Sequence, residues 1–267
     1  MSKRVLKMYG TEREKEILNI LSKNKYVTVD YLAEKIHISP SSIRRDLKKL
    51  ELEGLITRSY GGAELKSTVN KQIPFFLRRH KNAKEKLFAA RQAASLVNPG
   101  DVLFVDGSTT TYFMFDYLKN ISGITVVTNS LAGMSQCSEF GINSFLTGGK
   151  LNPENRSCFV GCYSENMIKS FHADWCFFSV QSLTRDGVLY DCFENEIMPR
   201  YLMMKNAEKR VFLCDSSKIN RFSAYRLCDV SEIDYIISDI NMRKYLNEDY
   251  PNIAFISEEG KTFTEQI

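Results

Sequence analysis

Hydroxyl and guanidinium side chains share one face of a helix that the sequence predicts from residue 40 onward. Ser39 is a favourable N-cap, and Pro40 takes the first helical position, where its missing N–H costs nothing. Ile43, Leu47 and Leu50 recur at the spacing of one helix face and are expected in a core. The opposite face carries groups that can contact phosphates and base edges: Ser41, Arg44, Arg45 and Lys48.

Two helices are predicted before this basic helix. Thr11 and Glu14 have the spacing of a capping box, and Thr28 is placed to cap a second helix. A short turn at His37-Ile38 then leads into the basic helix. This order is typical of a helix-turn-helix, in which the second helix of the motif enters the major groove of DNA.

A hairpin is predicted directly after the basic helix. Gly54 is typical of a helix end, and strands at 55–58 and 63–65 flank a tight turn at 59–62. The whole segment therefore predicts a winged helix-turn-helix. The DNA contacts that we expect are Ser39, Ser41, Ser42, Arg44, Arg45 and Lys48 from the helix, and Arg58 and Tyr60 from the wing.

A second group of polar residues follows apolar strands in the remainder of the chain. The run Asp106-Gly107-Ser108-Thr109-Thr110-Thr111 leaves one strand and opens a helix, and Asn129, Gly148-Gly149 and Lys218 follow three others. In parallel sheets, ligands bind outside such strand ends. Glycines, hydroxyls and N–H groups at a helix N-terminus suit an anion, above all a phosphate, and Lys218 adds a point charge. We therefore expect a shared binding crevice.

The elements that must position these residues alternate along the chain. Short apolar strands are predicted at 102–106, 124–130, 144–147, 173–180, 211–215 and 235–238, and helices at 84–97, 111–119, 131–138 and 194–207. The helix at 84–97 is expected to turn Leu87, Ala90, Ala94 and Val97 inward. This alternation predicts an α/β fold with a largely parallel sheet covered on both faces.

Charge and length favour two domains. Residues 1–66 hold 14 Lys and Arg against 9 Asp and Glu, whereas the remainder of the 267 residues holds 22 against 23. A basic N-terminal part fits a nucleic-acid reader. We expect a DNA-binding domain at 1–66, a connection at 67–80 that docks through Ile73-Pro74-Phe75-Phe76, and a ligand-binding domain at 81–267.

Composition argues against several other kinds of protein. The seven cysteines form no CxxC pair and the three histidines are scattered, so no metal site is expected, and no cofactor is either. No apolar run approaches the length of a membrane span, and the first residues lack the core of a signal peptide. We expect a cytoplasmic protein that does not bind membranes.

Four motifs of the N-terminal part occur in the order and spacing of a known family. V-D-Y-L-A, S-P-S-S-I-R-R-D-L, L-E-L-E-G-L-I-T-R and Y-G-G-A resemble the DNA-binding domain of the DeoR family of bacterial transcriptional regulators, over roughly residues 11–66. The family usually has His where this chain has Tyr60. The resemblance implies a double-stranded DNA operator as partner.

The remainder resembles the C-terminal domain of the same family over roughly residues 73–240, through P-F-F-L-R-R, P-G-D-V-L-F-V-D-G-S-T-T-T, V-V-T-N-S, T-G-G and D-S-S-K. That domain is similar to ribose-5-phosphate isomerase and binds a phosphorylated sugar that controls DNA binding. The resemblance implies phosphate recognition at 107–111, with Asp106, Asn129 and Lys218 around the sugar. Ser179, Gln181 and Ser182 stand where the family tends to have glycines or small residues, and we expect these side chains to crowd a ligand or change which one fits.

Three functions compete at this point. The first is a regulator, by family habit a repressor of carbohydrate genes, that self-associates to reach paired half-sites. The second is a sugar-phosphate isomerase with an added DNA-binding domain, but Val188 and Leu189 follow Asp186-Gly187 where an isomerase would carry carboxylates. The third is thiol sensing through Cys158 and Cys162, if both lie on one helical turn.

Overall fold

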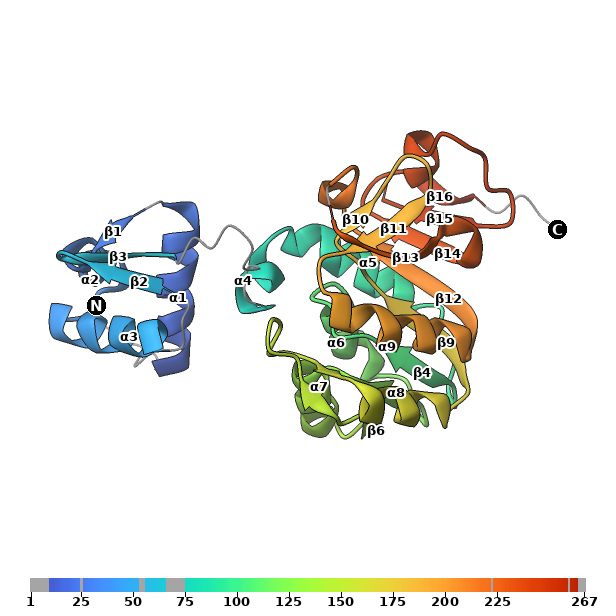
Figure 1. Cartoon of the computed structure of the whole chain (residues 1–267), viewed down its shortest axis with the longest axis horizontal. Helices are drawn as coiled ribbons and strands as arrows, with labels where there is room; N and C mark the ends of the chain where they lie inside the picture. Colours follow the sequence, from blue (N-terminus) through green and yellow to red (C-terminus); the bar gives the residue numbers. More distant parts are fainter. Residues whose placement is uncertain are drawn as a thin grey trace, which may run out of the picture. The chain divides into compact units, whose positions relative to one another are not determined.

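The computed structural model of the chain describes residues 10–24, 26–52, 56–65, 75–221, 223–258 and 260–263 (Figure 1). Its contacts divide the chain into two compact units between His80 and Lys81. Helix α4 (Phe75–His80) groups with the first unit. The expected connection at 67–80 lies outside the described residues up to residue 74.

The first unit is the winged helix-turn-helix that the sequence predicts. Its helices are α1 (Gly10–Lys23), α2 (Val29–Ile36) and α3 (Pro40–Leu52), and its antiparallel sheet has the order β1 (Val27–Thr28), β3 (Gly62–Leu65), β2 (Ile56–Ser59). The core is formed by fully buried apolar side chains from all three helices and the wing: Ile17, Leu21, Leu32, Ile43, Leu47, Leu50 and Ile56.

Side-chain caps begin two of these helices as expected. Thr28 Oγ1 accepts from the Tyr31 N–H at 3.2 Å, and Ser39 Oγ accepts from the Ser42 N–H at 3.3 Å. The Thr11 side chain, on which the predicted capping box depends, and Gly54 lie outside the described part. Glu14 forms an ion pair with Lys49 of α3 at 2.8 Å.

The second unit is built on an eight-stranded sheet with the order β16-β15-β14-β12-β9-β4-β5-β6, in which seven strands are parallel and β16 is antiparallel. The strands are β4 (Val102–Val105), β5 (Thr125–Thr128), β6 (Asn143–Leu146), β9 (Ala173–Phe178), β12 (Ala207–Cys214), β14 (Tyr235–Ser238), β15 (Ala254–Ser257) and β16 (Gly260–Phe263). The predicted α/β class and parallel sheet are confirmed.

Both faces of this sheet are covered. Neighbouring strand residues point to opposite faces, so each strand contributes side chains to both cores. Leu103 and Val105 pack with α5 (Ala83–Ala94), the short turn η1 (Thr111–Met114), α6 (Phe115–Leu118) and α7 (Leu131–Phe140). Phe104 packs on the other face with α8 (Cys162–Lys169) and α9 (Glu194–Lys205). A small sheet of β10 (Ser182–Leu183), β11 (Val188–Asp191) and β13 (Tyr225–Asp229) joins that second core (Figure 1).

Several short elements were not predicted. They are β7 (Lys150–Leu151), β8 (Phe159–Val160), η2 (Ser216–Lys218), η3 (Val230–Glu232) and η4 (Met242–Tyr245), in addition to β1, α4, α8, β10, β11, β13, β15 and β16. The predicted helix at 111–119 is the turn η1 followed by α6. No helix in the described ranges is long and apolar enough to cross a membrane.

The inward face of α5 differs from the prediction. Leu87 is 38% exposed, whereas Lys86 is only 4% exposed and takes the inward position beside Ala89 and Ala90. The helix begins one residue earlier than expected. It follows Asn82, whose left-handed φ of 52° sets the direction in which the chain enters the helix. Apolar spacing favoured Leu87, but the register of α5 on the sheet brings a lysine toward the strand ends instead.

Candidate functional site

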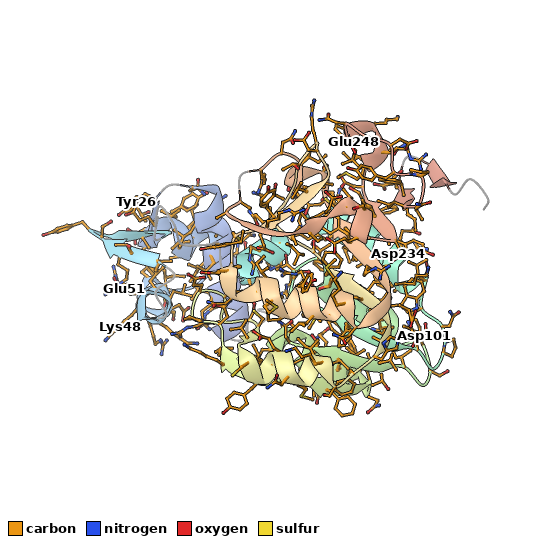
Figure 2. The ribbon with its side chains drawn as sticks, turned by 45° about the vertical axis from the view of Figure 1, so that its right-hand side comes forward. Tyr26, Lys48, Glu51, Asp101, Asp234 and Glu248 are labelled. Atoms are coloured by element: carbon orange, nitrogen blue, oxygen red, sulfur yellow. The ribbon has the colours of Figure 1, made fainter. Side chains whose placement is uncertain are left out.

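The predicted DNA-contacting face of α3 is exposed to solvent and does not pack in the core. Arg44, Arg45 and Lys48 are all exposed, and Lys48 projects from the helix in Figure 2. Ser39 and Ser41 are exposed at its start, and Ser39 Oγ lies 3.0 Å from the hydroxyls of both Ser41 and Ser42. The cationic and hydroxyl side chains therefore form one surface that runs from Ser39 to Lys48.

A partly buried ion pair fixes the rotation of α3. Arg13 of α1 donates to Asp46 through Nε at 2.9 Å and through a second guanidinium nitrogen at 3.0 Å, and Asp46 is 5% exposed. The hydrogen bonds to Asp46 raise the pKa of Arg13, against a smaller effect of desolvation. Because Asp46 follows Arg44 and Arg45 directly, anchoring it inward keeps both arginines on the outer face.

The wing adds a fourth cationic group to the three on α3. Arg58 of β2 donates to Glu51 of α3 from Nε at 2.7 Å, and the Arg58 N–H bonds the same carboxylate at 3.2 Å. Both side chains are close to two-fifths exposed, so this pair orients Arg58 more than it stabilises the fold. The pair therefore keeps the Arg58 side chain beside α3 and limits the other conformations that it can adopt.

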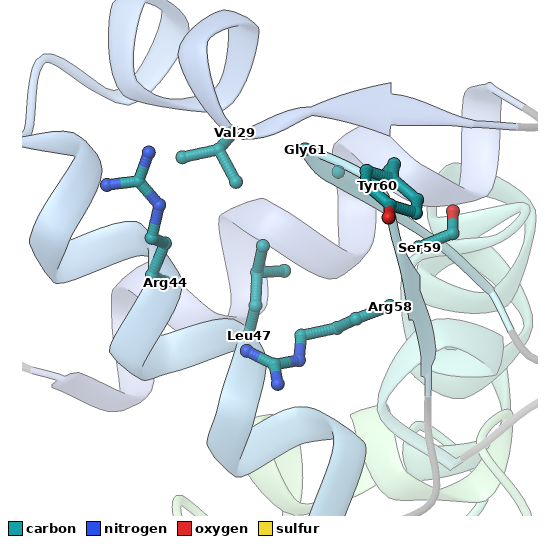
Figure 3. A pocket seen from close by; sticks show the side chains of 8 residues that line it. Val29, Arg44, Leu47, Arg58, Ser59, Tyr60 and Gly61 are labelled. Atoms are coloured by element: carbon teal, nitrogen blue, oxygen red, sulfur yellow. The ribbon is translucent and has the colours of Figure 1, made fainter.

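A hollow of about 470 Å³ separates α3 from the wing. Figure 3 shows Arg44 on one side, Arg58 and Tyr60 on the wing side, and Leu47 and Val29 at its base. The Tyr60 side chain is fully exposed. This arrangement places two cations and one aromatic ring around an open space. Such a space suits a polyanion, and a DNA strand is a polyanion.

In the second unit, the predicted strand ends lie next to one another. Lys218 follows β12, Asp106 follows β4, Asn129 follows β5 and Gly148 follows β6. These strands, with β9 between β12 and β4, are consecutive and parallel in the sheet. The strand order reverses between β4 and β9, and such switch points are where open α/β sheets bind ligands.

Asp106 organises the loop that follows β4. Its Oδ1 accepts from the Ser108 N–H at 3.1 Å and the Thr111 hydroxyl at 2.9 Å. Its Oδ2 accepts from the Ser179 N–H at 3.2 Å and Arg200 Nε at 2.9 Å. Asp106 is 2% exposed, so it shapes the loop from beneath, while Gly107, Ser108 and Thr109 form the loop itself.

Arg200 of α9 is, like Lys86, a residue that sequence reasoning missed. It is 4% exposed and contacts three carboxylates: Asp106 and Asp191 at 2.9 Å each, and Glu196 at 3.3 Å. Burial opposes its charge, but Asp191, Asp106 and Glu196 outweigh this effect and raise the pKa of Arg200. The sequence offered one signal, the spacing of four residues between Glu196 and Arg200 within the predicted helix.

Two lysines approach the hydroxyls of this loop. Lys86 Nζ lies 3.2 Å from Thr109 Oγ1, and Lys218 Nζ lies 3.3 Å from Thr110 Oγ1. Asp215 lies 4.0 Å from Lys218. Burial raises the pKa of Asp215. The charge of Lys218 and the hydrogen bonds from Ser217 and Asn82 together lower this pKa by more, so the net shift is downward. The loop therefore has two ammonium groups at its side, which suits an anion.

Ser179 and Ser182, where the family tends to have smaller residues, have partners within the protein. The Ser179 hydroxyl donates to the Leu213 carbonyl and accepts from Lys218 Nζ. The Ser182 hydroxyl donates to the Arg221 carbonyl. Ser179 thus ties Lys218 to the end of β9, which aims the lysine at Thr110.

Asn129 has a buried oxygen without a partner. Its Nδ2 donates to the Phe159 carbonyl at 3.1 Å, while its Oδ1 accepts from no group in the described part of the chain. The side chain is 5% exposed, and a Cβ built on Gly107 would lie 3.4 Å from that oxygen. A ligand hydroxyl at the glycine of the loop would satisfy it.

Gly148 and Gly149 both adopt left-handed φ, +64° and +98°, at the end of β6. A Cβ on Gly149 would lie 2.8 Å from the Val160 carbonyl and 3.1 Å from the Ser164 nitrogen, so the backbone at Gly149 closely approaches both. Thr147 next to them bonds Ser164 at 2.7 Å. The glycines therefore let the chain turn toward α8.

The two cysteines of the thiol hypothesis do not share a helical turn. Cys162 is exposed at the start of α8, whereas Cys158 lies before β8, is fully buried and contacts Glu196 at 3.1 Å. Burial, with Glu196 beside it, raises the pKa of Cys158, which disfavours its thiolate. The condition on which the thiol hypothesis depends, a shared helical turn, is therefore not met.

Comparisons with known proteins decide which family this site belongs to. Residues 13–69 match the DeoR-like helix-turn-helix domain, and residues 81–240 match the DeoR C terminal sensor domain. The HTH-type transcriptional regulator GolR of Listeria innocua is 32% identical over 90% of this chain and 94% of that protein. The HTH-type transcriptional repressor GlcR of Bacillus subtilis is 34% identical over 87% and 89%.

The chain belongs to the DeoR family. As a DeoR-family protein it is a DNA-binding transcriptional regulator, and its C-terminal unit is a sensor domain. The relatives are regulators and not enzymes, among them the glycerol-3-phosphate regulon repressor of Escherichia coli, 29% identical over 87% of this chain and 92% of that protein. The regulator hypothesis is therefore confirmed over the isomerase hypothesis.

Solved structures resemble parts of this DeoR-family chain. Ribose 5-phosphate isomerase A of Methanocaldococcus jannaschii is 16% identical, with a TM-score of 0.40 over 52% of this chain and 55% of that one. The delta subunit of eIF2B from Chaetomium thermophilum is 13% identical, with a TM-score of 0.46 over 86% and 72%.

Proposed function

We propose that this regulator represses carbohydrate-metabolism genes and that a phosphorylated sugar modulates its DNA binding. The observation that carries the effector half is the loop after β4, where Lys86 and Lys218 approach the hydroxyls of Thr109 and Thr110. A phosphate there would meet two ammonium groups, and a sugar hydroxyl would reach the unpartnered Asn129 oxygen. The names of two relatives support the proposal: GlcR is a transcriptional repressor, and another relative is a glycerol-3-phosphate regulon repressor.

The residues proposed to hold the effector are those of the strand ends. Gly107, Ser108, Thr109, Thr110 and Thr111 would surround the phosphate, with Lys218 as its point charge. Asn129, Gly148 and Gly149 would face the sugar, and Asp106 would act through the loop that it orders. On the DNA side, we propose α3 and the wing as the contacting elements, in a cytoplasmic homo-oligomer that reads paired half-sites.

Coupling requires that the ligand prefers one conformation of the protein, because equal affinity for two conformations shifts nothing. A typical coupling free energy of about 1–3 kcal/mol would change operator affinity by about 5- to 150-fold. We expect the ligand to weaken DNA binding and release the operator, as is usual in the family.

A screen of phosphorylated sugars by thermal shift tests the proposal, since a ligand stabilises the folded state by mass action. We expect at least one phosphosugar to raise the melting temperature of the full chain and to weaken its binding to DNA. Thr109→Val and Lys218→Ala should keep DNA affinity without ligand and lose both responses. The unphosphorylated sugar is the matched control. A broad panel without any melting shift would contradict the effector half and leave the DNA-binding half standing.

A further inference from the structure

The tip of the wing has a backbone that its own hairpin does not favour. Ser59 pairs with Gly62, so Tyr60 and Gly61 form a two-residue loop between β2 and β3. Gly61 has a φ of +74°, whereas Tyr60 is not among the residues with positive φ. Two-residue hairpins that match the twist of their strands need a positive φ at the first loop position. The tip therefore depends on contacts from outside the hairpin.

Those contacts come from one segment, the residues that lead into α2. Tyr26 Oη donates to the Tyr60 carbonyl at 2.6 Å, and the Val29 N–H donates to the Gly61 carbonyl at 2.8 Å. Both carbonyls of the loop are thus held by the segment that runs from Tyr26 through β1 to the first residue of α2.

Gly62 makes room for the Tyr26 ring. A Cβ at Gly62 would lie 2.5 Å from Tyr26 Oη and 2.3 Å from the Val27 carbonyl, so no other residue fits without a shift. β1 pairs with β3 through Thr28 opposite Gly62, which puts residue 26 on the same sheet face two positions along. The phenol therefore lies across Gly62 and reaches the tip diagonally.

We propose that Tyr26 is a positioning residue for DNA binding, whose hydroxyl fixes the wing tip so that the Tyr60 ring meets DNA beside α3. The ring of Tyr60 is fully exposed at the rim of the hollow that Arg44 and Arg58 border (Figure 3). This proposal rests on the proposed DNA contact of Tyr60. Without the Tyr26 hydroxyl, the ring of Tyr60 would sample several directions and lose part of its contact.

A double-mutant cycle tests this assignment with the full chain and a DNA duplex that the parent protein selects from a random-sequence pool. Tyr26→Phe keeps the ring over Gly62 and removes only the hydroxyl. We expect it to weaken binding by about 3- to 10-fold when Tyr60 is present, and to have no further effect in Tyr60→Ala. Tyr31→Phe on α2 is the matched control, since Tyr31 is 42% exposed against 41% for Tyr26.

The cycle separates the ways in which the idea can fail. Parent-like binding by Tyr26→Phe, with Tyr60→Ala impaired, would overturn the role of Tyr26 alone. Equal losses from Tyr26→Phe in both backgrounds would mean that Tyr26 acts on the fold or touches DNA itself, which also overturns it. Parent-like binding by Tyr60→Ala would overturn the wing contact, and with it the reason for positioning.

Discussion

Arg200 Nε lies 2.9 Å from Asp106 Oδ2, and both side chains are almost completely buried. This contact bonds α9, on one face of the sheet, to the loop that ends β4. Asp191 and Glu196 complete the surroundings of the arginine, so three carboxylates share one cation. Breaking a buried pair by removing one partner is costly because it leaves an unpaired charge. The loop proposed to hold the effector is therefore stiffened from below.

Stability should depend on pH through Glu196. Burial raises its pKa above the ordinary 4.5, with Arg200 opposing and Asp191 adding to the effect. A carboxyl with a raised folded-state pKa contributes fully below its unfolded pKa, and this contribution is lost as the pH rises through the folded value. Relative to Glu196→Gln, the parent should lose free energy of unfolding as the pH rises above 4.5, by ~1.4 kcal/mol for each pH step of one up to the folded pKa.

Urea unfolding at several pH values checks this, followed by the fluorescence of Trp175, the single tryptophan, which lies in the second unit. Glu194→Gln, at an exposed position on the same helix, is the control and should follow the parent. Parallel curves for the parent and Glu196→Gln would show that Glu196 has an ordinary pKa.

The Arg13–Asp46 pair should contribute far more than its exposed neighbour. Asp46→Asn leaves the guanidinium without its charged partner and is expected to lower the local stability of α3 by ~1.5–3 kcal/mol. Glu14→Gln breaks another α1–α3 pair, with Lys49 55% exposed, and should cost under about 0.5 kcal/mol. Hydrogen exchange of the α3 amides measures both values. Equal losses in the two variants would mean that burial of Asp46 does not matter.

Single substitutions on α3 should separate base reading from phosphate binding. Arg44→Ala or Arg45→Ala should cost about 1–3 kcal/mol of binding and relax specificity at one base position. Lys48→Ala should weaken all sequences alike and lower the salt slope by about one unit. Fluorescence anisotropy with duplex variants at several salt concentrations measures both effects. Arg91→Ala removes an exposed charge from the second unit as a control, and full binding by a folded Arg44→Ala/Arg45→Ala protein would refute the assignment.

Thiol reagents should distinguish the cysteines. Cys162 is exposed and should react with iodoacetamide in the native protein, whereas buried Cys137, whose pKa burial raises to about 11, and Cys158 should be spared. Mass spectrometry of the digested protein gives the labelled positions. DNA binding should survive the labelling. Loss of binding that Cys162→Ser prevents would revive thiol sensing.

The sequence predicted what local patterns control. The caps at Thr28 and Ser39, the apolar spacing of α3 and the parallel strands all follow from residues near one another in the chain. The cluster at the strand ends depends on distant partners instead: Arg200 meets Asp106 from 94 residues away, and Asn82 meets Asp215 from 133 residues away. Such pairs are set by the register of packed helices, as the exchange of Leu87 for Lys86 on α5 shows, and no local spacing encodes that register.

The strand order of the second unit has a consequence for how the chain is made. The edges of β4, at residues 102–105, are completed by β5 and by β9, and β9 in turn needs β12, which ends at residue 214. Helices α1 to α3 and the wing end by residue 65 and make local contacts, which form quickly. During synthesis from the N-terminus, the winged helix-turn-helix can thus fold on the ribosome while β4 still has an unpaired edge. Unpaired strand edges are where incomplete chains associate with one another and aggregate.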